Sequence, residues 1–411
     1  MTLKISKQYL RQLFFSVCVI IPFFNNYEIS FVFWVIALLF TIKKRYSSLF
    51  LSYLSHFILI LLLALLVGSF YEYNQYFVIR DITYMLKPIL GLVIGYQFFS
   101  EDTKDHFKFL LYAGIAMALI HLVLVLYGIG IMGARSVSDI RLYGGYFNDY
   151  EIYTLALLLF YKKFEIDITR KQYVYFLIIL AVSSFFYLAR TNFIQIVILF
   201  LALKGFLHLN KRSLTIFSVL FLLAVVGYTS IYYYNPKRNG GAVDEFLYKV
   251  KLIPLEAFST KINREDWKDF HDHYRSYENV RTVEQLLSNE TYIFGEGIGS
   301  QVDLKQKVFL GDMELRHISI LHNGYMTVFL KSGIPGLLLL IMSIFFFFKK
   351  FGTINEMDNN INLLFVGTGL FLIVSYWVFL GLYNLLDSKS IFIGYLFAYK
   401  NSLRLKHNVI R

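Results

Sequence analysis

Cysteine, proline and charged residues are scarce in this chain of 411 residues, and each scarcity excludes a class of structure. The single cysteine, Cys18, permits neither an intramolecular disulfide nor a cysteine-based metal site. With only 5 prolines, most helical runs are unbroken. Charged residues make up 17% of the chain and hydrophobic residues 57%. A soluble domain of this length needs more charge on its surface, so we expect a membrane protein.

Aromatic residues and positive charge are abundant instead. Phe, Trp and Tyr make up 19% of the chain, which suits helices that face lipid and aromatic belts at the membrane–water interface. The formal net charge is +12. Most of the positive charge lies in short loops between apolar runs, where it directs membrane topology. We therefore expect the lipid bilayer as a partner, and we do not expect nucleic acid.

Apolar runs of helical length recur along the chain. They lie near residues 10–25, 29–42, 49–70, 82–99, 107–131, 150–161, 173–189, 191–209, 213–234, 334–348, 361–381 and 389–402. A spanning helix needs roughly 20 apolar residues. The sequence thus predicts an all-α integral membrane protein with about 12 transmembrane helices, an uncleaved first helix among them, and one large, partly helical extracytoplasmic loop.

The distribution of Lys and Arg predicts the orientation. Loops assigned to the cytoplasm hold basic residues at 43–45, 104, 108, 162–163, 170–171, 211–212 and 349–350. The short outer loops hold only Arg80, Arg135, Arg141, Arg190 and Lys389. By the positive-inside rule, both termini are cytoplasmic. This orientation requires that residues 317–333 form a short helix at the outer surface and do not span.

The chain is thereby divided into three parts. Residues 1–234 hold transmembrane helices 1–9, residues 235–333 form the extracytoplasmic loop with short surface helices, and residues 334–411 hold helices 10–12 and a cytoplasmic tail. Within the loop, residues 265–287 place apolar side chains three or four positions apart. This spacing predicts one or two amphipathic helices.

His322 is the first candidate for chemistry, because it lies at the predicted outer mouth of the bundle, next to Asn323 and just before a helix. In one interpretation the pair only caps that helix. In the other, the imidazole acts as a base, since histidine exchanges a proton near neutral pH.

Two outer arginines are candidates for binding an anion. Arg141 lies in a polar stretch with Gly144-Gly145, and its guanidinium can hold a phosphate with two parallel hydrogen bonds. The alternative is an ordinary ion pair with Asp139 or Asp149. Arg190 lies between two apolar runs, where a charged residue is costly and is a functional candidate. The alternative for Arg190 is a side chain that extends to the outer interface.

Two further patterns are weaker evidence of a functional site. The string Gly295-Glu296-Gly297-Ile298-Gly299 lacks the Lys-Ser/Thr of a P-loop, and it predicts a tight loop that shapes the outer site. His271 and His273 lie two residues apart with aspartates nearby, which suits a solvated helix face better than a metal site. We expect no metal and no other cofactor.

Together these pieces resemble the O-antigen polymerase and O-antigen ligase superfamily of bacterial cell envelopes. The matching motifs are His322-Asn323 before Gly333-x-x-Gly336 and a spanning helix, Gly295-x-Gly297-x-Gly299, Arg190-Thr191 at a helix junction, and the segment from Arg141 to Asn148. A dozen helices with one large outer loop late in the chain also match. The resemblance implies a location in the bacterial inner membrane.

The resemblance also implies a reaction. Its polymerases join undecaprenyl-diphosphate-linked repeat units, and its ligases move finished glycan onto lipid A-core; both are metal-independent glycosyltransferases. We expect a polymerase, because polymerases are diverse and aromatic-rich like this chain. A ligase is one alternative, and a lipid-linked oligosaccharide flippase or transporter is another, although transporters of this size usually carry internal repeats and none is evident.

The site residues follow from charge, position and resemblance. The implied partners are the lipid-linked glycan, a chain-length regulator and a flippase. We predict catalytic roles for His322, Arg190 and Arg141. We predict substrate-binding roles for Arg135, Asn148, Arg281, Asn323 and Gly297.

Overall fold

The structure is a computed structural model, and it is mostly helical. It describes residues 7–24, 26–103, 105–207, 211–237, 244, 247–248, 250–252, 274–310, 313–349 and 352–410. The helices before the outer segment are α1 (Lys7–Ile20) with the 3-10 turn η1 (Ile21–Phe24), α2 (Tyr27–Phe40), α3 (Ser48–Gly68), α4 (Gln75–Phe98), α5 (His106–Gly130), α6 (Val137–Gly144), α7 (Asp149–Leu159), α8 (Arg170–Phe186), α9 (Arg190–Leu203) and α10 (Lys211–Tyr234).

The remaining elements are the C-terminal helices and the segment predicted to be extracytoplasmic, which is named the outer segment for that prediction. The outer segment holds α13 (Tyr274–Ser288), β1 (Val302–Leu310) and β2 (Met313–Ile318). The C-terminal helices are α14 (Gly324–Phe345) with η2 (Phe346–Phe348), α15 (Glu356–Val378), η3 (Gly381–Tyr383) and α16 (Lys389–Ile410).

Each apolar run of the sequence coincides with a helix, and polar caps set where many of these helices begin. Side chains of Ser47, Asn74, Asn148, Thr169, Asn323 and Asn355 accept hydrogen bonds from the first turns of α3, α4, α7, α8, α14 and α15. Such caps satisfy backbone N–H groups that have no partner within the helix.

Within the described part of the chain, four helices are long and apolar enough to cross a membrane. They are α3, α5, α14 extended by η2, and α15. The other helices vary in length: α4, α10 and α16 have 24, 24 and 22 residues, whereas α7 has only 11 residues. At 1.5 Å per residue it is about 16 Å long, well below the roughly 30 Å of a bilayer core. The structure therefore supports a helical membrane protein, while the total of about 12 spans stays a prediction.

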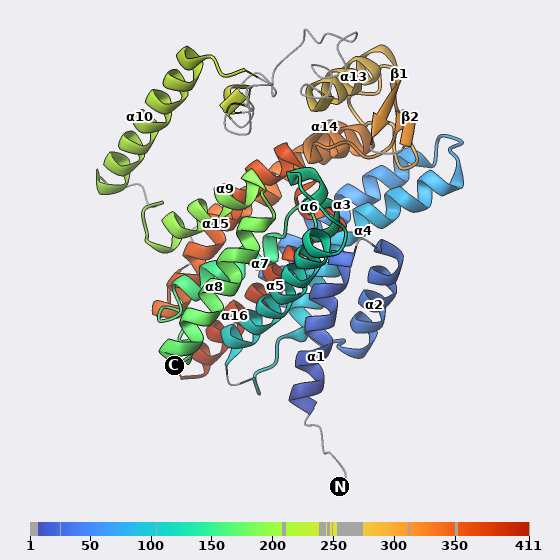
Figure 1. The fold of residues 1–411 in the computed structure, drawn as a ribbon. Helices are drawn as coiled ribbons and strands as arrows, with labels where there is room; N and C mark the ends of the chain where they lie inside the picture. Colours follow the sequence, from blue (N-terminus) through green and yellow to red (C-terminus); the bar gives the residue numbers. More distant parts are fainter. Residues whose placement is uncertain are drawn as a thin grey trace.

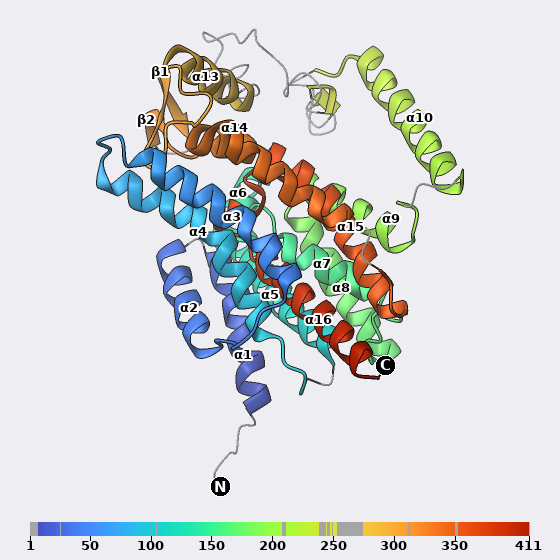
Figure 2. The same cartoon turned by 180° about the vertical axis from the view of Figure 1, so that it is seen from behind.

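The bundle has two distinct ends (Figure 1). The start of α1 and the end of α16 lie at one end, and α13, β1 and β2 lie at the other. Seen from behind, α16 runs close to α4, and α10 stands apart from the bundle in both views (Figure 2). Cys18 is fully buried in the core and contributes to packing. Which end faces the cytoplasm stays a prediction.

The outer segment differs from the all-helical expectation. Strands β1 and β2 pair as an antiparallel hairpin, with a register shift between Asp303 and Val308. Val302 and Leu304 are buried while Lys305 is exposed, an alternation with period two that is typical of a strand and that the sequence analysis missed. The predicted amphipathic helix is present as α13, and residues 265–273 of that prediction lie outside the described residues.

The segment predicted as a surface helix over 317–333 is helical only from Gly324 onward. Helix α14 is interrupted at Gly333, which has φ 60° and ψ −156°. A Cβ atom at this position would lie 2.1 Å from the carbonyl oxygen of Ile293, so a glycine is required. The break separates a short helical stretch from the longer apolar helix that follows it.

Candidate active site

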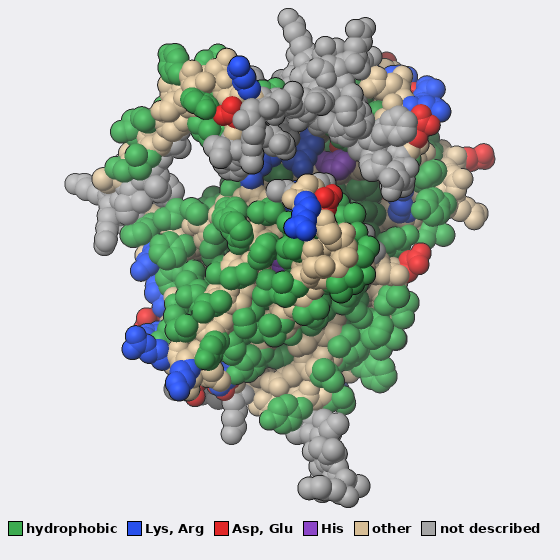
Figure 3. Space-filling model, viewed as in Figure 1, with side chains coloured by type: hydrophobic (Ala, Val, Ile, Leu, Met, Phe, Trp, Pro, Cys, Tyr) green, Lys and Arg blue, Asp and Glu red, His purple; other side chains and the backbone are tan. Residues whose placement is uncertain are grey.

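A cavity of about 720 Å³ lies where the outer segment meets the bundle. Its walls come from the end of α6 and the loop after it, the start of α9, helix α13, His322 and the end of α15. The space-filling view shows basic side chains and a histidine gathered in a hollow at this end of the molecule (Figure 3). The three residues predicted as catalytic, Arg141, Arg190 and His322, all line the cavity.

A third arginine joins Arg141 and Arg190 at the cavity wall. Arg275, on α13, lines the same space. Burial lowers the pKa of Arg141, and the positive charges of Arg190 and Arg275 lower it further, so both of these guanidinium groups act on Arg141. A cavity lined by three arginines is a favourable place for a polyanion such as a diphosphate.

Arg141 is not engaged by the carboxylates that the sequence offered as partners. Its Nη2 donates to the carbonyl oxygen of Tyr146 at 3.2 Å, and its guanidinium lies 5.1 Å from the centre of the Tyr146 ring. Asp139 instead forms a capping box with Ser136 at the start of α6. Asp149 is paired with Lys389. The ion-pair interpretation of Arg141 is therefore wrong.

His322 is held by a buried carboxylate. Its Nδ1 lies 3.0 and 3.1 Å from the two carboxylate oxygens of Glu278, and its backbone N–H donates to Glu278 Oε2 at 2.9 Å. The side chain of Glu278 is 1% exposed and that of His322 is 36% exposed. Because an ionised carboxylate only accepts, Nδ1 is the donor in this contact, and in a neutral imidazole the lone pair is then on Nε2, on the far side of the ring.

Asn323 plays the capping role that the sequence offered for the pair. Its side-chain oxygen accepts from the backbone N–H groups of Tyr325 at 2.9 Å and Met326 at 3.2 Å. It does not line the cavity. The capping interpretation therefore applies to Asn323, which caps α14. His322 instead contacts Glu278 and lines the cavity.

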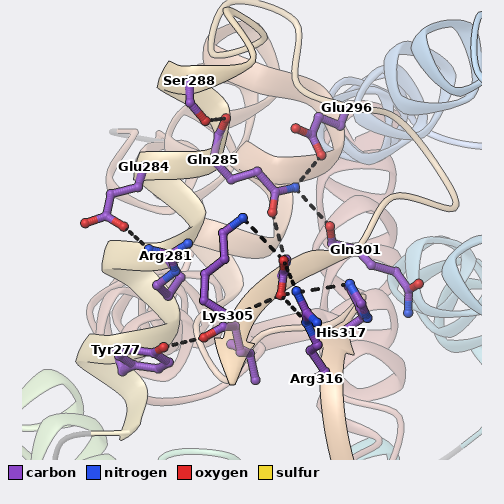
Figure 4. A network of polar contacts seen from close by, with 12 residues as sticks. Tyr277, Arg281, Glu284, Gln285, Ser288, Glu296, Gln301, Lys305, Arg316 and His317 are labelled. Atoms are coloured by element: carbon purple, nitrogen blue, oxygen red, sulfur yellow. Dashed lines mark hydrogen bonds and ion pairs between the residues drawn. The ribbon is translucent and has the colours of Figure 1, made fainter. Parts of the chain in front are cut away.

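Helix α13 contacts the hairpin as well as the cavity. On the hairpin side, Gln285 donates to Glu296 Oε2 at 2.7 Å and to the carbonyl of Gln301 at 2.9 Å, and it accepts from Asp303 N at 2.9 Å (Figure 4). Tyr277 donates to the carbonyl of Leu304. These bonds fix the rotation of α13, and hence the directions of Arg275 and Glu278.

The remaining predicted residues lie away from the cavity lining. Arg135 is exposed, and Asn148 is buried as the N-cap of α7. Arg281 is on α13 but pairs with Glu284 (Figure 4). Gly297 packs against the end of α3, where a Cβ atom would lie 2.2 Å from Gly68 N. The structure therefore gives Asn148 and Gly297 structural positions, and direct substrate contact by these residues stays a prediction.

A buried ion network lies behind the cavity wall. Lys389 Nζ lies 2.5 Å from Asp149 Oδ2 and 2.9 Å from Asp387 Oδ2, and Lys87 donates to the carbonyl oxygen of Asp387. Asp149 also lines the cavity. Lys389, predicted to lie in a short outer loop, is fully buried instead. Such a network is expensive to disrupt, because removal of one member leaves another charge buried and unpaired.

Sequence reasoning missed Arg275, Glu278 and Asn279, all of which belong to the site or support it. Arg275 precedes Glu278 by three residues and Asn279 by four, so the three side chains share one side of the helix. For metal ligands, the described residues contain no group of three His, Cys, Asp or Glu side chains that could hold an ion. His271 and His273 lie outside those residues.

Comparisons with protein-family models, curated proteins and solved structures found no match to this chain.

Proposed function

We propose that this chain is a membrane glycosyltransferase that joins polyprenyl-diphosphate-linked oligosaccharide units into a polysaccharide at the outer face of the bacterial inner membrane. The observation that carries the proposal is the meeting, in one cavity, of a carboxylate-held histidine with three arginines. The histidine is suited to moving a proton, and the arginines are suited to binding a diphosphate. The family resemblance of the sequence motifs supports the same reaction.

The chemistry is a displacement at the anomeric carbon of the donor sugar. The oxygen of an acceptor hydroxyl forms a bond to C1, the bond from C1 to the diphosphate oxygen breaks, and the lipid diphosphate leaves with the bonding electrons. The acceptor proton passes to Nε2 of His322. Glu278 accepts from Nδ1, orients the ring and stabilises the imidazolium that forms.

The arginines act on the leaving group. Negative charge grows on the diphosphate as the C1–O bond breaks, and fixed guanidinium groups stabilise that charge in the transition state. Arg141, Arg190 and Arg275 come from three different helices, so their positions are set by the fold rather than by the substrate. The cavity volume of about 720 Å³ is within the usual range for ligand sites, about 300 to 1,000 Å³.

Deletion of the gene tests the class of function. A polymerase deletion should leave single repeat units on the surface carrier, and a ligase deletion should accumulate long chains on the polyprenyl carrier. A flippase deletion should trap unpolymerised units inside the cell. Either of the last two outcomes would replace the proposal with the corresponding alternative.

Point variants test the assignment of roles at matched protein levels. His322→Ala, Arg190→Lys and Arg141→Ala should each abolish or shorten the polymer, because loss of a positioned base costs about 10²- to 10⁴-fold in rate and lysine lacks the planar fork of arginine. His317→Ala and Arg170→Lys are controls, since both residues are exposed and neither lines the cavity. Normal polymer in His322→Ala cells would remove His322 as the base.

A further inference from the structure

One wall of the cavity is aromatic rather than cationic. Trp377 and Phe379, at the end of α15, and Phe147, after α6, all line it. Phe379 is fixed between two rings: its centroid lies 5.1 Å from that of Phe147 and 6.2 Å from that of His322, both nearly perpendicular. Trp377 is 37% exposed, whereas Trp34 in the bundle core is 1% exposed.

A buried polar atom without a partner lies in the same cavity. Asn279 lines it from α13, and its Oδ1 is buried with no hydrogen-bond partner among the described residues. An acceptor left unpaired in this way costs free energy unless a ligand or water completes it. Asn279 directly follows Glu278, the residue that holds His322, and the contacts of Gln285 with the hairpin position the same helix.

We infer that Trp377, Phe379 and Asn279 form the subsite for the acceptor sugar, an inference that rests on the proposed function. The flat indole face stacks on the apolar face of a pyranose ring, and Asn279 Oδ1 accepts a hydrogen bond from a sugar hydroxyl. These three residues are therefore determinants of acceptor specificity. They are distinct from the arginines, which bind the diphosphate of the donor.

The location of His322 supports this division of the cavity. The base has to reach the acceptor hydroxyl while the leaving diphosphate departs from the opposite face of C1. His322 is packed edge-on against Phe379 of the aromatic wall, and its partner Glu278 shares α13 with Arg275 of the cationic wall. The histidine thus lies beside the aromatic wall, where the acceptor hydroxyl would be presented to Nε2.

Tryptophan fluorescence of the purified full-length chain in lipid nanodiscs tests the inference. In a Trp34→Phe, Trp267→Phe double variant, Trp377 is the remaining indole, since the chain has 3 Trp residues. The probe is the free oligosaccharide released by mild acid from the host's own polyprenyl-linked repeat units. We expect a saturable change in emission, and Asn279→Ala in this background should raise the half-saturating concentration about 3- to 10-fold. Ser288→Ala, on the same helix outside the cavity, should not.

Polymer length in cells provides a second measurement that does not depend on the fluorescence variants. Trp377→Ala and Asn279→Ala should shorten the polymer, and Trp377→Phe should largely restore it because a stacking ring is kept. The Trp34→Phe variant is the matched control for loss of an indole outside the cavity. Equal polymer length in Trp377→Ala, Trp377→Phe and wild-type cells would overturn the subsite.

Failure of the subsite and failure of the proposed function give different results. Protection of the chain from thermal unfolding by undecaprenyl diphosphate, with no response of Trp377 to the oligosaccharide, would refute the aromatic subsite and leave the donor site standing. If undecaprenyl diphosphate does not protect the chain, the oligosaccharide does not change the emission of Trp377, and His322→Ala cells make normal polymer, then the subsite and the proposed function are both wrong.

Discussion

Substitution of Glu278 by glutamine is the most informative single change, because it keeps the shape of the side chain and alters only its hydrogen-bonding. In the native chain the carboxylate accepts from both the Nδ1 and the backbone N–H of His322. The amide of glutamine can still accept from the backbone, but its NH₂ group faces Nδ1 as a donor. The imidazole then takes the other tautomer, with its proton on Nε2, and cannot act as a base toward the cavity.

The expected effect on activity is large and the effect on folding is moderate. Loss of a positioned base corresponds to about 10²- to 10⁴-fold in rate, or roughly 3 to 5.5 kcal/mol in the barrier. The stability cost is that of one hydrogen bond to a charged group, about 1.5 to 3 kcal/mol. The chain should therefore still accumulate in the membrane while its polymer is lost or shortened.

The assay compares polymer length on gels from cells with matched protein levels. Glu314→Gln is the control, because Glu314 pairs with Lys307 on the exposed face of the hairpin and lies outside the cavity. Thermal unfolding of the purified variant separates inactivation from misfolding. Wild-type polymer in Glu278→Gln cells would show that the tautomer of His322 is irrelevant, and it would refute the proton-transfer role.

Three further predictions concern stability and topology. Lys389→Ala should lower the free energy of unfolding by about 3 to 5 kcal/mol in a denaturation assay, since two buried carboxylates lose their partner; a loss below 1 kcal/mol would contradict the buried network. The hydrogen bond from Arg316 holds the pKa of Asp303 well below its usual range, so its stabilisation is present above about pH 4 and is lost as the pH falls further. Hydrogen-exchange protection of the hairpin should fall in that acid range, and Asp303→Asn should remove the dependence. A membrane-impermeant maleimide should label Lys305→Cys but not Lys162→Cys in intact cells, and the reverse pattern would invert the topology.

The sequence was sufficient to locate the apolar helices because each of them has a local signal, whereas the short helix α6 was not predicted. An apolar run of helical length and a polar residue that caps its start are both visible without the fold, as at Asn323 and Asn355. The hairpin was missed because its alternation is short and follows a glycine-rich stretch. The number of spans is harder to predict, because a helix such as α7 is apolar and yet short for a bilayer.

Site residues could be predicted only where the sequence itself marks them, as a charged residue between apolar runs or as a polar residue just before a helix. Arg141, Arg190 and His322 stood out for that reason, and the cavity brings them together. Arg281 was chosen instead of Arg275, although both are on α13. At 100° per residue they point about 120° apart, and only the contact of the helix with the hairpin decides which of them faces the cavity. That contact is a tertiary interaction, and no local sequence pattern predicts it.

The glycine string shows a related ambiguity. A glycine with φ of +80°, such as Gly297, allows another group to approach closely, but the sequence does not identify the group. A phosphate and a helix backbone impose the same requirement, and here the neighbour is the backbone of Gly68.

The packing of Gly297 on Gly68 anchors the outer segment to α3, while Gln285 anchors α13 to the hairpin and Glu278 anchors α13 to His322. The cavity is therefore assembled from two parts of the chain: the bundle supplies Arg141 and Arg190, and the outer segment supplies Arg275 and Asn279. Neither part holds the full set of groups that the proposed reaction needs, so the contacts that join the two parts set the geometry of the cavity.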